Sequence, residues 1–195
     1  MIYYDEFDSA LGRMLATAEG GVLTGLYFAA QKYHPASTDG WTADPEAQPF
    51  PAVRRQLQEY FAGLRRVFDF PIAPGGGRAT PFQQAIWKAI AAVPFGVTTT
   101  YARLAAQCGQ PTAARAAGAA TGRNPVSLVI PCHRIVGGSG ALTGYAGGLS
   151  RKRALLDFER AIAGGQAGAM DALLPRDLFG AANGNVGPRS MALIG

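Results

Sequence analysis

The sequence contains few of the residues that build metal sites and disulfide frameworks. Its 195 residues include two cysteines, Cys108 and Cys132, and two histidines, His34 and His133. A tightly bound zinc ion needs about four nitrogen or sulfur ligands, and these residues lie too far apart along the chain to favour such a site. With no export signal, we expect both cysteines to be reduced thiols in the cytoplasm.

Apolar runs long enough to cross a membrane are also lacking. No run approaches the ~18 residues that a transmembrane helix requires. The N-terminal residues 1–8 are acidic and lack the basic-then-apolar pattern of a secretory signal. Hydrophobic residues make up 48% of the chain and charged residues 16%, as is usual for globular domains. We therefore expect a cytoplasmic protein with no membrane partner.

Acidic residues are absent from a long central segment. Residues 1–69 hold nine acidic and six basic residues, whereas residues 70–156 hold no acidic residue and nine basic ones. Residues 157–195 add four acidic and three basic residues, which gives the net charge of +5. An acid-free segment of 87 residues is typical of a surface that binds a polyanion such as nucleic acid. The alternative is that an Ala- and Gly-rich composition contains few acids by chance.

The first part of the chain has the pattern of strands followed by a helix. Apolar runs at residues 11–18 and 22–28 flank Glu19-Gly20-Gly21, which predicts a β-hairpin. Residues 35–50 are rich in Pro, Asp, Thr and Ala and indicate a surface loop. Apolar residues at helical spacing then predict a helix over about residues 53–64. We find no chemistry in this part and interpret it as scaffold.

The second part begins after Pro74-Gly75-Gly76-Gly77, which has the composition of a linker. Thr80 is expected to cap a helix, with Pro81 at its first position and Gln83 closing a capping box. The helix is expected to bury Phe82, Ile86, Ile90 and Val93.

Two short helices are predicted next, over residues 100–108 and 112–121, joined by Gly109-Gln110-Pro111. This order is typical of a helix-turn-helix. Arg115 is the only large side chain of the second helix. Such a smooth helix could lie close to a groove of DNA or pack against a neighbouring helix.

An apolar run at Val126–Ile130 predicts a strand that leads into Pro131-Cys132-His133-Arg134. Glycine-rich segments follow, and Ser150 is expected to cap a last helix that ends near Ile162. The Gly/Ala-rich residues 164–195 indicate a loosely held tail.

Cys132 is the candidate nucleophile. A thiol reacts as a thiolate, and at an ordinary pKa of ~8.5 it is mostly protonated at neutral pH. His133 could accept the proton, and Arg134 adds positive potential. Adjacent residues on a strand point to opposite faces, so a contact between Cys132 and His133 would need a bridging water or an irregular backbone.

Glu159 strengthens this interpretation. Leu155, Glu159 and Ile162 fall on one stripe of the last helix, so that the carboxylate occupies a position where an apolar residue is expected. A buried carboxylate needs a partner, and orienting the imidazole of His133 is one such use. The alternative is an edge position where Glu159 reaches solvent or pairs with Arg160 or Lys152.

From Thr80 to Glu159 the sequence resembles the O6-alkylguanine-DNA alkyltransferases, also called methylated-DNA–protein-cysteine methyltransferases. The matching motifs are Phe82-Gln83, Val93-Pro94-Phe95-Gly96-Val97-Thr98, Thr100-Tyr101, Ala114-Arg115-Ala116-Ala117-Gly118, Asn124-Pro125, Ile130-Pro131-Cys132-His133-Arg134, and Gly144-Tyr145 with Gly147-Gly148-Leu149. Pro-Cys-His-Arg after Asn-Pro is the most specific of them. Residues 1–70 resemble the family's N-terminal domain more loosely, and the zinc site of some members has no counterpart.

The resemblance implies an α+β fold. It places a ribonuclease-H-like N-terminal domain at residues 1–74 and a mostly helical alkyltransferase domain with a helix-turn-helix at residues 78–163. The flexible tail would span residues 164–195.

The resemblance also implies catalytic roles. Cys132 would accept the alkyl group, His133 would remove its proton through a water molecule, and Glu159 would hold the imidazole. Asn124 would tie the recognition helix to the active-site strand. Tyr101 would press on the phosphate 3′ to the target and donate a hydrogen bond to the expelled base.

Substrate and DNA contacts are implied for the remaining residues. Tyr145 and backbone N–H groups would hold the O6 edge of guanine, and Lys152 would support the active-site loop. Ala146 stands where many members have serine, so that side-chain contact would be lost here. Arg115 would fill the gap left in the base stack. The remaining DNA contacts would come from Thr112, Ala114, Arg123 and Tyr101.

Together these roles imply direct repair of O6-alkylguanine in double-stranded DNA, with O4-alkylthymine as a second candidate lesion. The protein would act as a monomer from the minor groove on a flipped base, at the nucleoid if the source is bacterial. Because a thioether is not expelled, each molecule would react once, and no cofactor would be needed.

Two other functions remain open at this point. A cysteine hydrolase built on Cys132, His133 and Glu159 would turn over many times, but it leaves the acid-free segment and Arg115 unexplained. A binding module, either a helix-turn-helix regulator or a lesion sensor without repair activity, explains the DNA features. The sensors that resemble this family lack the acceptor cysteine, which is present here.

Overall fold

The N-terminal residues form a four-stranded sheet with the strand order β3-β2-β1-β4. In the computed structural model, which describes residues 1–168 and 170, the strands are β1 (Ile2–Ser9), β2 (Gly12–Glu19), β3 (Val22–Phe28) and β4 (Thr42–Ala43). β1, β2 and β3 are antiparallel neighbours, and β4 runs parallel to β1. The predicted hairpin over β2 and β3 is confirmed. β1 was not predicted, and β4 lies inside the segment that was expected to be a loop.

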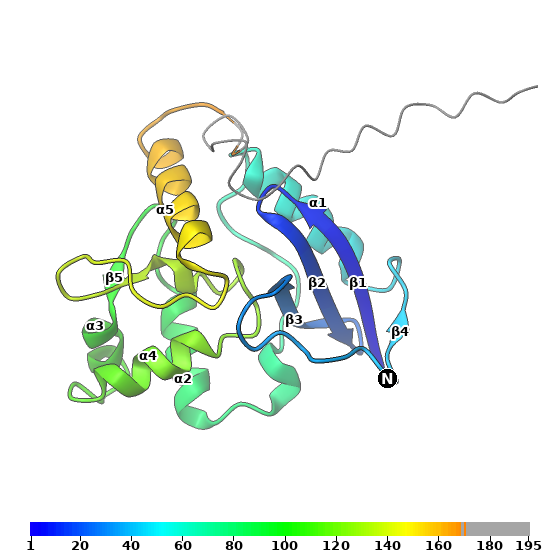
Figure 1. Cartoon of the computed structure of the whole chain (residues 1–195), viewed down its shortest axis with the longest axis horizontal. Coiled ribbons are helices and arrows are strands. Elements are labelled where there is room, and N and C mark those ends of the chain that lie inside the picture. Colours follow the sequence, from blue (N-terminus) through cyan, green and yellow to red (C-terminus); the bar gives the residue numbers. More distant parts are fainter. Residues whose placement is uncertain (169, 171–195) are drawn as a thin grey trace, which may run out of the picture.

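Helix α1 (Phe50–Phe61) packs against this sheet (Figure 1). Its buried residues Phe50, Val53, Leu57 and Tyr60 recur at helical spacing, as the sequence pattern predicts. Tyr60 is the polar member of this stripe, and its hydroxyl group therefore needs a partner inside the protein.

The C-terminal part is mostly helical and lies beside the sheet (Figure 1). A 3-10 turn at Pro74–Gly77 leads into it, and a second one spans Cys132–Arg134. Its regular elements are α2 (Pro81–Ala91), β5 (Thr99–Thr100), α3 (Tyr101–Gln107), α4 (Ala114–Gly122), β6 (Ile135–Val136) and α5 (Leu149–Ala163). The α+β fold with a helix-turn-helix made by α3 and α4 is confirmed.

Helix α2 begins as the sequence predicts. The Thr80 side chain accepts a hydrogen bond from the Gln83 backbone at 3.2 Å, and the Gln83 side chain accepts one from the Thr80 backbone at 2.9 Å. Pro81 occupies the first turn, where a missing N–H has no cost.

The two parts share main-chain hydrogen bonds at the edge strand β3. Leu26 donates to the Pro125 carbonyl at 2.8 Å and accepts from the Ser127 N–H at 2.8 Å. The side chain of Ser127 donates to Gln31 at 3.1 Å. An exposed edge strand would offer unpaired backbone groups, and this contact covers the edge with the segment that precedes Cys132. One hydrophobic core runs through both parts.

Two local predictions were wrong. Val126–Ile130 is an irregular turn rather than a strand, with Leu128 at a positive φ of 71° and a single bridge from Val126 to Leu26. Its apolar residues reflect burial, which an irregular backbone satisfies as well as a strand does. Ser150 does not cap α5, because the helix begins at Leu149 after Gly148, which makes no side-chain cap.

Most of the predicted tail, residues 164–195, lies outside the described residues; within its described part, Met170 is buried in the core. In the described part of the chain, no helix has the length and apolar character needed to cross a membrane. Residues 1–168 and 170 contain no cluster of three or more His, Cys, Asp or Glu side chains able to hold a metal ion.

Candidate active site

Cys132 is the first residue of the 3-10 turn and is only 4% exposed. Asn124, which follows the end of α4, donates from Nδ2 to the Ile130 carbonyl at 2.7 Å and to Cys132 Sγ at 3.2 Å. Asn124 Oδ1 accepts the Val126 N–H at 3.0 Å. A single buried amide therefore connects the end of the helix-turn-helix, the irregular turn and the thiol.

The environment of Cys132 alone does not make it a thiolate. Burial raises the pKa of the thiol, and the Asn124 hydrogen bond and the charge of Lys152 oppose this rise only in part. Burial also lowers the pKa of Lys152 to about 8. A base is therefore needed to remove the thiol proton near neutral pH.

His133 follows Cys132 in the chain and is the predicted base. It is fully buried, and its Nε2 lies 3.0 Å from Glu159 Oε1. Burial lowers the pKa of the imidazole and outweighs the opposing effect of Glu159, so the ring is neutral at neutral pH. Because Glu159 is an acceptor, Nε2 carries the hydrogen and Nδ1 carries the lone pair. Nδ1 has no hydrogen-bond partner among the described residues.

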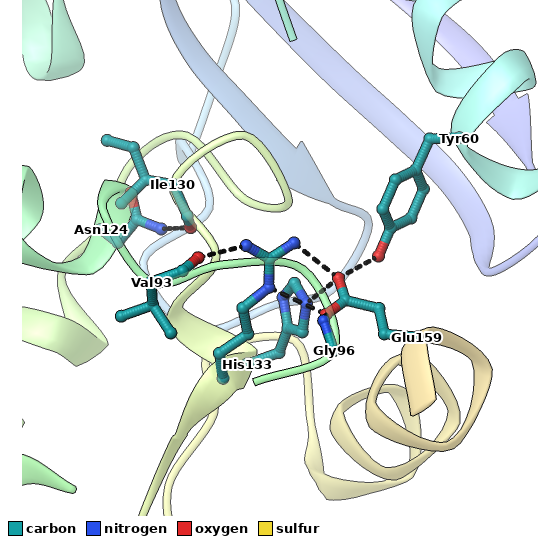
Figure 2. Close-up of polar contacts among 8 residues, drawn as sticks. Tyr60, Val93, Gly96, Asn124, Ile130, His133 and Glu159 are labelled. Atoms are coloured by element: carbon teal, nitrogen blue, oxygen red, sulfur yellow. Dashed lines mark hydrogen bonds and ion pairs between the residues drawn. The ribbon is translucent and has the colours of Figure 1, made fainter. Parts of the chain in front are cut away.

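Glu159 is fully buried and accepts five hydrogen bonds (Figure 2). Arg134 donates from Nε to Oε2 and from Nη2 to Oε1, both at 2.8 Å, and its Nη1 donates to the Val93 carbonyl at 2.6 Å. The backbone of Gly96 donates to Oε2 at 3.0 Å. Tyr60 from α1 donates to Oε1 at 2.7 Å.

These donors decide the charge of Glu159. Burial alone would raise the pKa of the carboxyl, but the hydrogen bonds and charges of His133 and Arg134 hold it well below its usual range. Glu159 is therefore ionised, and its negative charge is neutralised by Arg134. These hydrogen bonds agree with the expectation that a buried Glu159 has a polar partner inside the protein.

Three partners of Glu159 were missed in the sequence. Arg134 lies in the same motif as Cys132, but nothing in the motif indicates that its guanidinium group binds Glu159, which is 25 residues further along the chain. Tyr60 sits in a stripe of apolar residues, and the part of the chain that contains it was interpreted as scaffold. Gly96 contributes only its backbone, for which the sequence has no signal.

The glycine-rich loop (residues 137–148) is held from two sides. Tyr101 donates its hydroxyl to the Thr143 carbonyl at 3.0 Å, and Lys152 Nζ donates to the same carbonyl at 2.7 Å. Lys152 is fully buried and also donates to the Ile135 carbonyl. The predicted support of the loop by Lys152 fits these contacts, whereas the Tyr101 hydroxyl is engaged with the loop in this structure.

Tyr145 and Ala146 belong to this loop. The Tyr145 ring meets the His133 ring edge-on, with centroids 6.4 Å apart. Its hydroxyl is buried and has no hydrogen-bond partner among the described residues. The Ala146 carbonyl accepts the Lys32 N–H at 2.9 Å, which ties the loop to the N-terminal domain.

The predicted DNA-binding residues gather on α4 and its flanks. Arg115, Thr112 and Arg123 are exposed, and Ala114 is half-buried. The opposite face of α4 packs into the core through Ala117, Ala120 and Thr121. Packing, one of the two uses left open for this helix, is therefore met by its inward face, and its outward face is smooth except for Arg115.

Tyr101 lies between α4 and the glycine-rich loop. A Cβ atom at Gly118 would lie 3.6 Å from its ring, an ordinary van der Waals distance, so the tyrosine ring lies against α4 at this position. Tyr101 thus connects the outward helix with the loop beside Cys132.

The helical domain thus combines a buried thiol next to a histidine with a helix-turn-helix whose second helix has an exposed face, and both features are found in the family that the comparisons identify. Two protein-family models match this sequence. Residues 81–161 match the DNA binding domain of 6-O-methylguanine DNA methyltransferase, and residues 2–74 match its ribonuclease-like domain. The methylated-DNA–protein-cysteine methyltransferase of Mycobacterium bovis is 46% identical over 160 residues, which cover 82% of this chain and 93% of the relative. The one of Methanosarcina acetivorans is 40% identical over 158 residues, which cover 81% of this chain and 98% of the relative.

A solved structure agrees. The crystal structure of Mycobacterium tuberculosis OGT in complex with DNA has a TM-score of 0.75 and 44% sequence identity, and the match covers 82% of this chain and 94% of that one. The chain belongs to the 6-O-methylguanine DNA methyltransferase family.

Proposed function

We propose that this protein repairs alkylated DNA directly, by transferring the alkyl group from O6 of guanine to Cys132. The observation that carries the proposal is the buried Nδ1 of His133, which has no hydrogen-bond partner among residues 1–168 and 170. His133 is adjacent to Cys132 in the chain, and its Nε2 contacts the ionised Glu159. The known structure of a relative bound to DNA supports DNA as the partner.

The reaction needs only the groups of this chain and a water molecule. Through that water, His133 takes the thiol proton, and Sγ attacks the alkyl carbon in line with O6. The Sγ–C bond forms as the O6–C bond breaks, and the electron pair goes to the guanine. The departing guanine takes up one proton, which balances the one that left the thiol. Tyr101 and Tyr145 are proposed as hydroxyl donors to the base.

Access to the thiol requires the nucleotide to leave the base stack. Cys132 is nearly fully buried, so an intact duplex cannot bring its O6 atom to Sγ, whereas a flipped base can enter a pocket at a cost of a few kcal/mol. The outward face of α4 is proposed to lie in the minor groove, with Arg115 filling the vacated position. Thr112, Ala114 and Arg123 would then flank the phosphates.

Several properties follow from this proposal. The product is a thioether that no group in the site expels, so each molecule reacts once, without a cofactor. The protein would act as a monomer in the cytoplasm, where the DNA of a bacterial nucleoid lies. Residues 1–74 would be the ribonuclease-like domain, residues 78–163 the alkyltransferase domain and residues 164–195 a tail. Asn124 is proposed to hold the thiol turn against α4.

Intact mass measurement tests the proposal. The protein is incubated with a duplex oligonucleotide that contains one O6-methylguanine, and we expect a gain of one methyl group located on Cys132. The Cys132→Ala variant should remain unmodified and still bind the duplex, while Cys108→Ala, which removes the other thiol, should react like the wild type. Tight binding with no methyl gain by the wild type would contradict the proposal and favour a lesion sensor. Release of free product over many turnovers would favour a hydrolase.

A further inference from the structure

Tyr60 brings the N-terminal domain into the network beside the thiol. It lies in the last turn of α1, is 1% exposed, and donates its hydroxyl to Glu159 Oε1 at 2.7 Å. The same oxygen is 3.0 Å from His133 Nε2. Figure 2 shows that the phenol and the imidazole reach this oxygen from different elements. They therefore share one acceptor.

Packing holds the phenol in this place. The Tyr60 ring is surrounded by aromatic rings whose centroids lie 5.3 to 5.9 Å away. They belong to Phe61, Phe68, Phe95 and Phe158. Burial, together with the nearby charge of Glu159, raises the pKa of Tyr60 well above its ordinary value. The hydroxyl therefore remains a donor throughout the pH range in which the protein is folded.

Arg134 Nη2 also donates to Glu159 Oε1, at 2.8 Å, so three donors compete for the electron density of this oxygen. Each hydrogen bond to an ionised carboxylate spreads its negative charge and weakens its hold on the other donors. We propose that Tyr60 is a positioning residue which, by sharing Glu159 Oε1 with His133, limits how strongly the imidazole holds a proton and keeps it free to act as the base. The effect on alkyl transfer rests on the proposed function, whereas the effect on His133 does not.

Other charged and titratable groups also face the pair. Arg134 and Cys132 belong to the 3-10 turn, Lys152 to α5 and Tyr145 to the glycine-rich loop. The positive charges of Arg134 and Lys152 disfavour the imidazolium. All of these groups are kept when Tyr60 is changed to Phe, so this substitution removes a single hydroxyl and leaves the ring packing in place.

The first measurement is a pH titration of the histidine rings by NMR. The chain has only two histidines, so His34 serves as an internal reference for His133. In Tyr60→Phe, we expect the titration of His133 to move to higher pH and that of His34 to stay unchanged. Tyr4→Phe is the matched control, since this tyrosine of β1 contacts the ring of Trp41 and lies outside the set of donors to Glu159. It should leave the titration of His133 unchanged.

The second measurement is the single-turnover rate of methyl transfer from an O6-methylguanine duplex as a function of pH. The acidic limb should move to higher pH in Tyr60→Phe, with about a threefold lower rate near pH 6 and a smaller change on the plateau. An even loss at all pH values, with the His133 titration unmoved, would overturn the proposal and leave Tyr60 a structural residue. If the wild type transfers no methyl group, the proposed function fails, and the titration still decides the role of Tyr60.

A second substitution covers the case in which Tyr60→Phe does not fold. Site-specific replacement of Tyr60 by 3-fluorotyrosine keeps the hydroxyl and makes it a stronger donor. The titration of His133 should then move to lower pH, opposite to the effect of removing the hydroxyl. Movement in the same direction in both variants, or in neither, would contradict competition for Oε1.

Discussion

The Glu159 network and the outward face of α4 are built in opposite ways. Around Glu159, five hydrogen-bond donors meet one buried carboxylate, and its charge is balanced by Arg134. The face of α4 that carries Arg115 is exposed, and its chemistry is available to a partner. The polar groups of the first region are paired within the protein, whereas those of the second face solvent.

This difference follows from the cost of burying charge. A buried carboxylate is tolerated only with partners that replace its water shell, so every group around Glu159 contributes to both folding and chemistry. An exposed arginine remains solvated and contributes little to folding. Substitutions in the Glu159 network should therefore change the stability of the protein, whereas substitutions on the outward face of α4 should change only its action on DNA.

The largest expected effect is on the stability of the Glu159→Gln variant. The substitution leaves the charge of Arg134 buried and unpaired, which typically costs on the order of 3–5 kcal/mol. Urea denaturation should show this loss in the free energy of unfolding. Asp157→Asn is the control on the same helix, because Asp157 is exposed and its contact with Arg160 spans 3.4 Å; it should change stability by less than about 0.5 kcal/mol. Equal effects of the two substitutions would remove the contrast between buried and exposed charge.

The pH dependence of stability sharpens the same contrast. In the folded state the pKa of His133 lies below its ordinary value of 6.5, so the unfolded chain takes up this proton first and stability falls as the pH drops below 6.5. The pKa of Glu159 lies below 4.5, so its contribution is complete above pH 4.5 and is lost as the pH falls through the folded value. Urea denaturation across this range should show a steady loss of stability on acidification.

Two variants test the origin of this loss. His133→Gln should flatten the part of the profile just below the ordinary pKa of histidine, and Arg115→Ala should leave the profile unchanged. A wild-type profile that stays level through this range would contradict the assignment.

The smallest effect in free energy is expected for Arg115→Ala, and it should appear only with DNA. We expect an unchanged free energy of unfolding and about a tenfold lower rate of methyl transfer from a duplex, equivalent to ~1.4 kcal/mol. The loss should be smaller on a single-stranded oligonucleotide, where no stack has to be refilled. Lys88→Ala removes another exposed cation of the acid-free segment and should change the rate less. The same loss on both kinds of DNA would argue against insertion into the stack.

The sequence predicts the parts of the molecule that depend on short-range signals. The cap of α2 by Thr80 and Gln83 and the hairpin around Gly20 follow from residues within a few positions of one another. The position of Glu159 on an apolar stripe points to a buried partner, because a lone carboxylate at such a place is unfavourable.

The structural features that the sequence does not predict depend on contacts between distant segments. Tyr60 is 99 residues from Glu159 in the sequence. Its aromatic ring alone accounts for its place in an apolar helical stripe, so the sequence gives no sign that its hydroxyl has a partner. The strand predicted at Val126–Ile130 was wrong because hydrophobicity reports burial and not backbone shape. This error matters for the site, since strand alternation would have separated Cys132 from His133, whereas both lie in one 3-10 turn.

The contact between Leu26 and the segment before Cys132 has a consequence for local unfolding. The backbone of β3 hydrogen-bonds on both sides of Val126, through Pro125 and Ser127, and Asn124 links the same turn to the thiol. The edge of the sheet thus holds the turn that precedes Cys132 (residues 125–131) in its conformation. Local opening of this turn must break main-chain bonds of the sheet edge, so the geometry at Cys132 should be lost in the same cooperative unit as the N-terminal domain.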